Sequence, residues 1–411
     1  MQKTVLILDA YYEPEIIAFS HLEKDLIGGI IEKGYKVKVI CPTPTRGITA
    51  KTAKEYKKIK KEIKNDGNLE ILRFSAPQEG KSVVLRAIRY FWCNFRTIHF
   101  AKKSNADLIF SNSTPPTQGY ISGKVAKKKN IPFLYSLQDV FPDSLVSTGL
   151  TKEGSVIWKI GRFIENRTYL KADKIITISN PMKNNLLAKG VSEKKLEIIP
   201  NWVDTQKIRP VLKSENKLIS ELGVLPDSFI VVYAGNMGES QNVDIILDVA
   251  KDFSSKNILF LLFGSGSEFD RIKERVKQEN INNIVIRGLM PPDRISEVYS
   301  LGDLALITGK KGVGKTGLPS KTWSIMACNT PIVASFDTDS ALSDVLEKSG
   351  GGTCVEPENE KPLAKEIEKK YNEWSLNIKT ECNSRDYVKN NLSKQICVSR
   401  YLREIENMLN S

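Results

Sequence analysis

Residues 317–335 read GLPSKTWSIMACNTPIVAS, a segment in which a short helix with a proline near its start precedes a strand. Pro319 suits the first turn of a helix because its missing N–H is not needed there, and Asn329 suits the helix end. Ile332, Val333 and Ala334 then form a short apolar run typical of a buried strand. We therefore predict a helix from about Pro319 to Asn329, followed directly by a strand.

The residues just before this segment match a different motif. Residues 309–316, GKKGVGKT, fit the phosphate-binding loop pattern G-x-x-x-x-G-K-[ST] and follow the strand-like run 304–307. In such a loop the helix starts at once, and a proline three residues after Thr316 would cost about 3 kcal/mol. The chain that follows Thr316 is also short for the rest of an NTPase sheet. An NTPase therefore stays only as an alternative.

Length and composition indicate an ordinary globular protein with two domains. The chain has 411 residues, of which 41% are hydrophobic and 27% charged, which argues against disorder. The start, MQKTVLILDA, reads as a strand too short for a signal peptide, and we find no window apolar enough for a membrane span. The six cysteines are scattered without C-x-x-C pairs, so we expect reduced thiols, a cytoplasmic protein and no metal site.

The charge favours a polyanionic or anionic partner, because 61 Lys and Arg against 48 Asp and Glu leave +13. Residues 51–64, KTAKEYKKIKKEIK, contain seven lysines, for which a solvated helix face is the favoured interpretation. Residues 86–103, RAIRYFWCNFRTIHFAKK, interleave basic and aromatic side chains.

An aromatic stripe runs along this second basic stretch. Read as a helix, five side chains spaced by three or four residues form one continuous face: Leu85, Ile88, Trp92, Phe95 and His99. The favoured interpretation of this face is a helix that buries the stripe in its own domain. The alternative is a helix at a membrane interface, with the aromatic side chains inserted and the arginines around them. The sequence leaves both alternatives open.

Strand-like runs alternate with helix-length segments in two sets. The first set comprises runs at 5–8, 37–40, 69–72, 108–110, 133–135, 175–178 and 196–199. The second comprises runs at 230–233, 258–262, 284–286, 304–307 and 332–334. Strands joined by helix-length connections predict parallel sheets, so we expect an α/β fold with two doubly wound domains. Ligands in such folds sit at the carboxyl ends of the strands, where chemistry should be sought.

The order of segments resembles the retaining glycosyltransferases of family 4. The resemblance rests on GLPSKTWSIMACNTPIVAS and on further segments in the family's order, among them KTVLILDAYYEPE, LEIIPNWVDTQKIRP, VVYAGNMGESQNVDIILDVA and FLLFGSGSEFDRIK. It implies the GT-B architecture of two Rossmann-like domains facing a cleft, an enzyme of class EC 2.4, a UDP-sugar donor and no metal or other cofactor. It divides the chain into an acceptor-binding domain at 1–200, a linker at 201–227, a donor-binding domain at 228–385 and a C-terminal helix at 386–411 that crosses back.

The chain departs from the family at the donor site. Two glutamates of the family are matched by Ser324 and Thr316, and the Arg and Lys that hold the diphosphate are matched by Asn236 and by Gln241 or Asn242. Lysines of the loop 310–321 are therefore expected to neutralise the diphosphate, together with backbone N–H groups. The predicted donor-binding residues are Gly235, Asn236, Gly264, Gly266, Leu289, Lys315, Pro319, Ser320, Lys321 and Ser324.

The predicted catalytic residues are Asp139 and Glu13 on the acceptor side and Lys321 on the donor side. Asp139 and Glu13 both follow strands, although a helix cap and a turn acid are equally good interpretations of them. No carboxylate nucleophile is identifiable, and the resemblance implies front-face transfer in which the leaving phosphate helps to accept the proton.

Residues 137–150, LQDVFPDSLVSTGL, make the chain most similar to bacterial transferases of lipid-linked surface polysaccharides, such as O antigen and capsule. That group includes enzymes that transfer sugars of the N-acetyl-fucosamine type. The resemblance implies a polyprenyl-diphosphate-linked acceptor, a peripheral position on the inner face of the cell membrane and no nucleic-acid partner. A GT-B protein that binds a nucleotide-sugar without catalysis remains a further alternative, because the two glutamates are absent.

Overall fold

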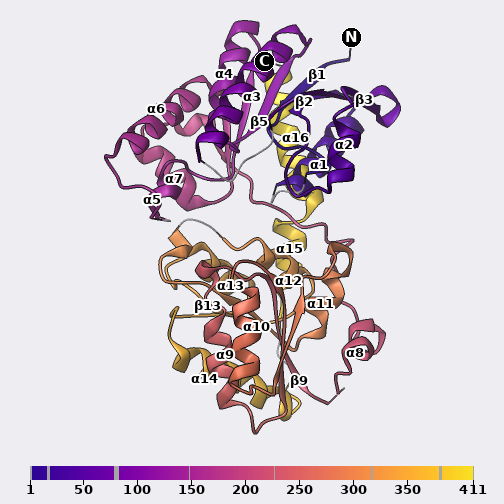
Figure 1. The fold of residues 1–411 in the computed structure, drawn as a ribbon, viewed down its shortest axis with the longest axis vertical. Coiled ribbons are helices and arrows are strands. Elements are labelled where there is room, and N and C mark those ends of the chain that lie inside the picture. Colours follow the sequence, from indigo (N-terminus) through magenta and orange to yellow (C-terminus); the bar gives the residue numbers. More distant parts are fainter. Residues whose placement is uncertain are drawn as a thin grey trace. The chain divides into compact units, whose positions relative to one another are not determined.

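A computed structural model of the chain, drawn in Figure 1, describes residues 2–15, 19–77, 83–147, 149–225, 227–315, 318–378 and 382–410. The chain forms two compact units, one of Met1–Asn201 with Cys397–Ser411 and one of Trp202–Ile396. Each unit holds one sheet with helices packed on it. The predicted α/β class with two doubly wound domains is confirmed.

The first unit contains an eight-stranded sheet in the order β3-β4-β2-β1-β5-β6-β7-β8. All neighbouring strands are parallel except β3, which is antiparallel to β4. Its strands are β1 (Thr4–Leu8), β2 (Lys36–Pro42), β3 (Lys61–Lys64), β4 (Leu69–Phe74), β5 (Leu108–Asn112), β6 (Phe133–Leu137), β7 (Lys174–Thr177) and β8 (Leu196–Ile198). Its helices are α1 (Ser20–Glu32), α2 (Ala50–Tyr56), α3 (Val83–Lys103), α4 (Thr117–Lys129), α5 (Asp143–Ser147), α6 (Val156–Lys171), α7 (Asn180–Ala188) and most of α16 (Lys394–Asn410).

The second unit contains a six-stranded, wholly parallel sheet in the order β11-β10-β9-β12-β13-β14. Its strands are β9 (Phe229–Asn236), β10 (Ile258–Ser265), β11 (Ile284–Gly288), β12 (Leu304–Thr308), β13 (Ile332–Ser335) and β14 (Gly352–Val355). Its helices are α8 (Lys217–Leu222), α9 (Asp244–Asp252), α10 (Phe269–Gln278), α11 (Ile295–Leu301), α12 (Lys321–Ala327), α13 (Ala341–Ser349), α14 (Glu360–Ser375) and α15 (Ser384–Asn391).

Alternate residues of β6 show how the first sheet is covered. The Tyr135 ring packs toward α4 and α6, where it lies 6.4 Å from the ring of Tyr169. Its neighbour Ser136 points to the other face, where its hydroxyl lies 3.0 Å from that of Tyr401 on α16. Strand side chains alternate between faces, so helices of two groups bury the two sides of one sheet.

Two local predictions need correction. The lysine run 51–64 is not one helix face, because α2 ends at Tyr56 and Lys61–Lys64 form the edge strand β3. A strand at a sheet edge tolerates lysines because its outer side meets water, and the charge discourages pairing with other chains. Strand β14 was not predicted, because Gly352–Val355 is short and only partly apolar.

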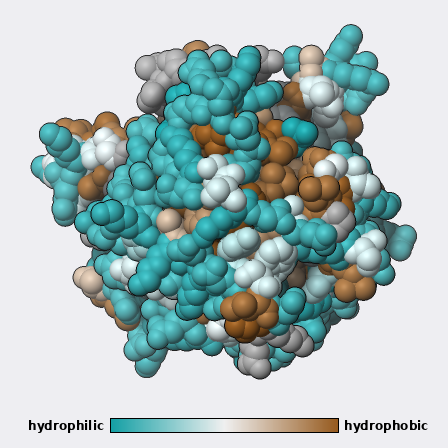
Figure 2. All heavy atoms as spheres, turned by 90° about the horizontal axis from the view of Figure 1, so that it is seen from below, coloured by the Kyte–Doolittle hydropathy of each residue, from teal (hydrophilic) through white to brown (hydrophobic). Residues whose placement is uncertain are grey.

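The surface gives no sign of a membrane-spanning segment. Within the described residues, no helix combines the length and the apolar character needed to cross a bilayer. Hydrophilic residues cover most of the face shown in Figure 2, with hydrophobic residues in groups between them.

The buried hydroxyl pair of Ser136 and Tyr401 provides a test of how α16 is held on the first unit. We expect Tyr401→Phe to lower the free energy of unfolding by about 1 kcal/mol, the net value of one buried hydrogen bond. Chemical denaturation of the full chain measures it. Tyr35→Phe is the matched control, because Tyr35 is half-buried and its hydroxyl shows no hydrogen bond to any of the residues that the structure describes. An equal loss of unfolding free energy in both variants would contradict a stabilising hydrogen bond between Ser136 and Tyr401.

Candidate functional site

A cavity of about 340 Å³ opens at the carboxyl-terminal edge of the second sheet. Its lining comes from the ends of β9 and β12, from the residue after β13 and from the segment leading into α12. The lining residues are Gly235, Asn236, Ser240, Gln241, Thr308, Val313, Leu318, Pro319, Ser320, Lys321 and Phe336. Parallel strands bring their carboxyl ends to one edge, so segments far apart in sequence meet here.

The turn after β9 depends on glycines. Gly235 has φ +146°, a conformation that side chains rarely adopt. A Cβ on Gly264 would lie 2.7 Å from the Gly235 carbonyl oxygen, and one on Gly266 would lie 2.5 Å from the Met237 carbonyl oxygen. Gly264 and Gly266 therefore allow the backbone of the turn to pack directly against them, because neither has a Cβ. Neither residue lines the cavity.

The amides of Asn236 and Gln241 bind each other across this turn. The Asn236 amide nitrogen donates to Gln241 Oε1 at 2.7 Å, and the same oxygen accepts from the Gly238 N–H at 3.1 Å. The Thr308 hydroxyl donates to the Gln241 carbonyl at 2.6 Å. These bonds fix a neutral, polar wall where the family resemblance implied two cations.

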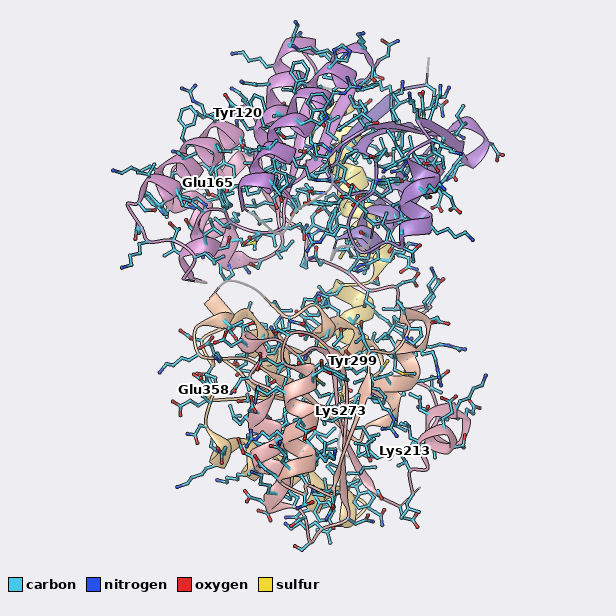
Figure 3. All side chains as sticks on the ribbon, viewed as in Figure 1. Tyr120, Glu165, Lys213, Lys273, Tyr299 and Glu358 are labelled. Carbon is cyan, nitrogen blue, oxygen red and sulfur yellow. The ribbon has the colours of Figure 1, made fainter. Side chains whose placement is uncertain are left out.

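The glycine-rich loop 309–315 is bound to a carboxylate of the chain itself. Asp337, buried just after β13, accepts from the Gly312 N–H at 2.8 Å and from the Gly314 N–H at 2.7 Å. The Lys311 N–H donates to Glu358, labelled in Figure 3, at 3.2 Å. A phosphate-binding loop needs such N–H groups for the nucleotide, and here they are already bonded.

The helix after this loop also starts too late for a phosphate-binding loop. Helix α12 begins at Lys321, with Ser320 as its N-cap residue, so Pro319 precedes it. The predicted start near Pro319 is two residues early, and the helix ends at Ala327 rather than Asn329. The side chain of Lys315 and all of Thr316 lie outside the described residues. Together with the Asp337 contacts, this geometry contradicts the NTPase interpretation.

Lys321 is the charged group of the cavity. Its aliphatic chain is partly exposed, but its Nζ is buried and has no hydrogen-bond partner within the described part of the chain. The Nζ lies 3.7 Å from the centroid of the Tyr233 ring, whose face attracts a cation. Burial lowers the pKa of Lys321 to about 7. An ammonium placed in a cavity without a counter-ion is suited to receive an anionic ligand.

The predicted donor residues divide into those that meet at this cavity and those that do not. Gly235, Asn236, Pro319, Ser320 and Lys321 line it. Ser324 does not line it, and Leu289 is 53% exposed beyond the end of β11. The prediction missed Thr308 and Phe336. Thr308 directly follows the predicted strand 304–307 and Phe336 lies two residues after the predicted strand 332–334, so both could have been found from their positions.

The two acceptor-side acids lie in the first unit. Glu13 is part of a surface ion-pair group, 3.1 Å from Lys24 Nζ and 4.0 Å from Lys64 Nζ. Asp139 follows β6, and its carboxylate accepts hydrogen bonds from the Ser144 side chain and the Val140 N–H. Burial of the carboxylate outweighs these bonds and raises the pKa of Asp139. This geometry serves a turn before α5 and also makes the carboxylate a stronger base.

Three buried acids near β1 were missed. Asp9 and Glu23 are both buried and contact each other, and burial raises the pKa of both carboxyls. Two such groups can share one proton, because two negative charges in contact would repel. Glu15 accepts from the N–H groups of Thr45 and Arg46, both at 2.7 Å. No spacing in the sequence separates these acids from surface acids.

Within the described residues, no group of three or more His, Cys, Asp or Glu side chains could hold a metal ion. The cavity offers neutral amide and hydroxyl side chains and the buried Lys321 nitrogen. This combination suits a phosphorylated organic molecule better than a metal.

Comparison with protein families gives two matches that together cover most of the chain. The family described as "Glycosyltransferase Family 4" matches residues 24–207, and "Glycosyl transferases group 1" matches residues 214–391.

Individual relatives agree with these families. The putative colanic acid biosynthesis glycosyl transferase WcaI of Escherichia coli K12 is 25% identical over 68% of this chain and 69% of its own. The probable glycosyltransferase WbjE of Pseudomonas aeruginosa is 25% identical over 65% of this chain and 67% of its own. The solved structure of Anabaena Alr3699/HepE in complex with UDP superposes with a TM-score of 0.71 at 16% identity, covering 99% of this chain and all of that one.

The buried ammonium of Lys321 predicts an unusual dependence of stability on pH. The unfolded chain keeps the lysine pKa near 10.4, so between about pH 7 and 10 the unfolded state binds more protons and stability rises with pH. We expect Lys321→Met, without ligand, to raise the free energy of unfolding at pH 7 by roughly 2 kcal/mol or more. The gain should shrink toward zero near pH 10.

Thermal or urea unfolding at both pH values measures the effect. Lys310→Met is the control, because Lys310 is exposed to solvent in its pair with Glu239. A Lys321→Met variant that is less stable than wild type at pH 7 would contradict the unpaired ammonium.

Proposed function

Because the chain belongs to glycosyltransferase family 4 and has the GT-B fold, we propose that it is a retaining transferase that takes its sugar from a UDP-sugar and transfers it to a lipid-diphosphate-linked acceptor. The transferase activity itself, of class EC 2.4, follows from the family. The relative WcaI of Escherichia coli is described as a putative colanic acid biosynthesis glycosyl transferase, which supports a role in bacterial polysaccharide biosynthesis. The observation that carries the donor assignment is the buried, unpartnered Lys321 ammonium in the cavity.

The donor argument starts from charge. A nucleoside diphosphate brings negative charge, and Asn236 and Gln241 cannot neutralise it because their amides are uncharged and bonded to each other. Lys321 is the cation whose Nζ is buried in this cavity, within the residues described there. A charge-assisted bond to it would be strong because the surroundings exclude water. The UDP bound in the structurally similar HepE supports a uridine nucleotide as the ligand.

The same placement suits the chemical step. In front-face transfer the bond from the anomeric carbon to the diphosphate oxygen breaks as the acceptor hydroxyl oxygen bonds to that carbon. The leaving phosphate gains negative charge that an ammonium such as Lys321 stabilises, and it helps to accept the hydroxyl proton. No metal is required for this charge balance when lysine supplies the cation.

On the acceptor side we propose Asp139 as the group that orients or deprotonates the acceptor hydroxyl. Asp139 is exposed, and its raised pKa makes it a better base than an aspartate with the ordinary pKa. Glu13 remains a weaker proposal, because it is engaged by two surface lysines. We propose an N-acetylated deoxyamino sugar as the donor sugar from the resemblance of residues 137–150, and a peripheral position on the cytoplasmic face of the membrane.

Turnover of UDP-sugars with a polyprenyl diphosphate-linked sugar acceptor tests the function directly. A mass-spectrometric screen of UDP-sugars retained by the purified protein would first identify the donor. Transfer in the presence of a chelator is the expected result. Binding of UDP-sugar without turnover would indicate a non-catalytic member, and ATP hydrolysis that needs magnesium would reinstate the NTPase.

Lys321 is expected to decide donor affinity. A lost charge-assisted contact costs roughly 1.5 to 3 kcal/mol, so Lys321→Ala should weaken UDP binding about 10- to 150-fold. Isothermal titration calorimetry with UDP measures this. Thr316→Ala should change the affinity by less than about threefold, whereas a phosphate-binding loop would need that hydroxyl for magnesium. The reverse pattern would refute the donor site.

Asp139 is expected to act on turnover and not on donor binding. Asp139→Asn should lower the rate of transfer by a factor on the order of 10² or more, which is typical of general-base catalysis, while the Kd for UDP stays unchanged. Asp66→Asn is the control, because Asp66 is exposed and has φ +51°, a conformation that asparagine also tolerates. Wild-type turnover in Asp139→Asn would leave Asp139 with a purely structural role.

A further inference from the structure

The aromatic stripe predicted on α3 is a solvent-exposed surface of the first unit. The favoured interpretation, burial of the stripe in its own domain, is wrong, because its large side chains are exposed. The exposed fractions are 54% for Leu85, 56% for Ile88, 44% for Trp92 and 60% for Phe95, and Phe91, which was not part of the predicted stripe, is 79% exposed. The opposite side of α3 packs inward, as the buried Arg89, Cys93 and Thr97 show. This helix therefore presents its most apolar side to solvent, which soluble helices avoid.

A second exposed apolar stripe lies on α6. It is formed by Val156, 72% exposed, Ile157, 58%, Ile160, 56%, Phe163, 53%, and Leu170, 73%. The buried side of the same helix includes Gly161, Glu165 and Tyr169. Two helices of the first unit, α3 and α6, thus each expose a row of apolar side chains, which is more than the isolated exposed apolar residues that are common on protein surfaces.

Helix α4 joins these two helices into one layer on the sheet (Figure 1). It contacts α6 closely, since a Cβ on Gly119 would lie 2.5 Å from Thr168 Cγ2 and one on Gly123 would lie 2.6 Å from Lys171 Cβ. It contacts α3 through the Asn94 amide, which donates to the Thr117 hydroxyl at 3.1 Å. The outer side of α4 carries Lys124, Lys127 and Lys128, which are exposed, and the half-buried Tyr120 labelled in Figure 3. We call the solvent-facing side of α3, α4 and α6 the three-helix face.

The three helices of this face also carry nearly all of the chain's excess positive charge, and of their basic residues Arg89 is buried on the opposite side of α3. The three helices contain 13 Lys and Arg and a single acid, Glu165, whereas the whole chain has a net charge of +13. Glu165 is buried and paired with Arg162 and Lys189, so it adds no negative charge to the surface. An anionic partner would therefore meet a surface without repulsion.

Cations and rings alternate on this face. Arg167 lies 5.2 Å from the Phe163 ring centroid, and Lys124 lies 4.5 Å from that of Tyr120. Long basic side chains can keep their charged ends among headgroups while their stems and the neighbouring rings enter the apolar layer. This combination of exposed aromatic and aliphatic side chains with Lys and Arg is the composition of helices that lie in a membrane interface.

We propose that the three-helix face docks on an anionic lipid bilayer, with the apolar side chains of α3 and α6 entering the interface and the basic residues contacting the headgroups. The choice of a bilayer rests on the proposed function, because a lipid-linked acceptor is confined to a membrane. The exposed Leu, Ile and Val side chains argue against nucleic acid, which offers them no apolar partner. The absence of exposed acids from these helices argues against a second copy, since two such surfaces would repel each other.

Flotation with vesicles of phosphatidylcholine, with and without phosphatidylglycerol, tests the proposal on the full chain. Wild type should bind the anionic vesicles, bind neutral vesicles much less, and release as salt rises. Phe91→Ser with Phe95→Ser should weaken binding at least about tenfold by removing the inserted side chains. Lys124→Gln with Lys127→Gln and Lys128→Gln should weaken it about 10- to 100-fold.

Matched controls come from the second unit. Leu212→Ser with Leu225→Ser removes two side chains that are 66% and 70% exposed, and Lys361→Gln, Lys365→Gln and Lys369→Gln remove three exposed lysines of α14. Both controls should bind vesicles like wild type. All changes are at exposed positions, and unchanged melting temperatures would show that each variant folds.

UDP binding, measured in parallel, separates this proposal from the donor assignment. Face variants that lose vesicle binding but retain UDP binding would support the proposal. Vesicle binding by wild type without any UDP binding would refute the donor site and leave the three-helix face supported. The proposal would be overturned if the face variants bound vesicles as well as wild type does. It would also be overturned if wild type formed a dimer that these variants lose, or if the protein bound RNA more strongly than vesicles.

Discussion

The parallel pairing of β9 with β10 and β12 is the constraint on which the donor cavity depends. The pairing sets Gly235 beside Gly264 and Val232 beside Ala305, so the three strands end at one edge. The turns that leave them are crowded there. Only residues without a Cβ fit beneath the turn after β9, and this packing fixes the wall that faces Lys321. The chemistry of the cavity therefore follows from backbone geometry before any side chain is considered.

Within that wall, charge is distributed unevenly. Asp337 satisfies the N–H groups of the glycine-rich loop, Glu239 pairs with Lys310, and Asn236 bonds Gln241. Among the described side chains around the cavity, Lys321 keeps its buried nitrogen without a hydrogen-bond partner. An unpaired buried cation destabilises the folded state, and folded proteins keep such groups mainly where a ligand compensates. The polar network around the cavity thus leaves the Lys321 ammonium without a counter-ion, and the proposed diphosphate would supply the negative charge.

In our proposals the two units attract anions by different physical means. In the second unit, a single ammonium acts at short range in surroundings that exclude water, which favours one specific ligand. In the first unit, many basic side chains act together in water at the surface of α3, α4 and α6, where each contributes little and salt screens them. The apolar side chains between them supply the part of the attraction that salt does not screen. A lipid-linked acceptor and a nucleotide-sugar donor call for these two kinds of recognition.

Local sequence determined most of the strands, the alternation with helices and the break at Pro319, but not β3 or β14. These features depend on side-chain periodicity and on backbone rules that act over a few residues. The sequence also showed that one side of α3 is apolar. It could not show what covers that side, nor that Asp337 occupies the N–H groups of a loop whose residues match a phosphate-binding motif. It did not distinguish the buried pair of Asp9 and Glu23 from surface acids, or the supporting Gly264 from a lining glycine. Exposure and pairing depend on contacts between segments distant in the chain, so only the tertiary structure decided them.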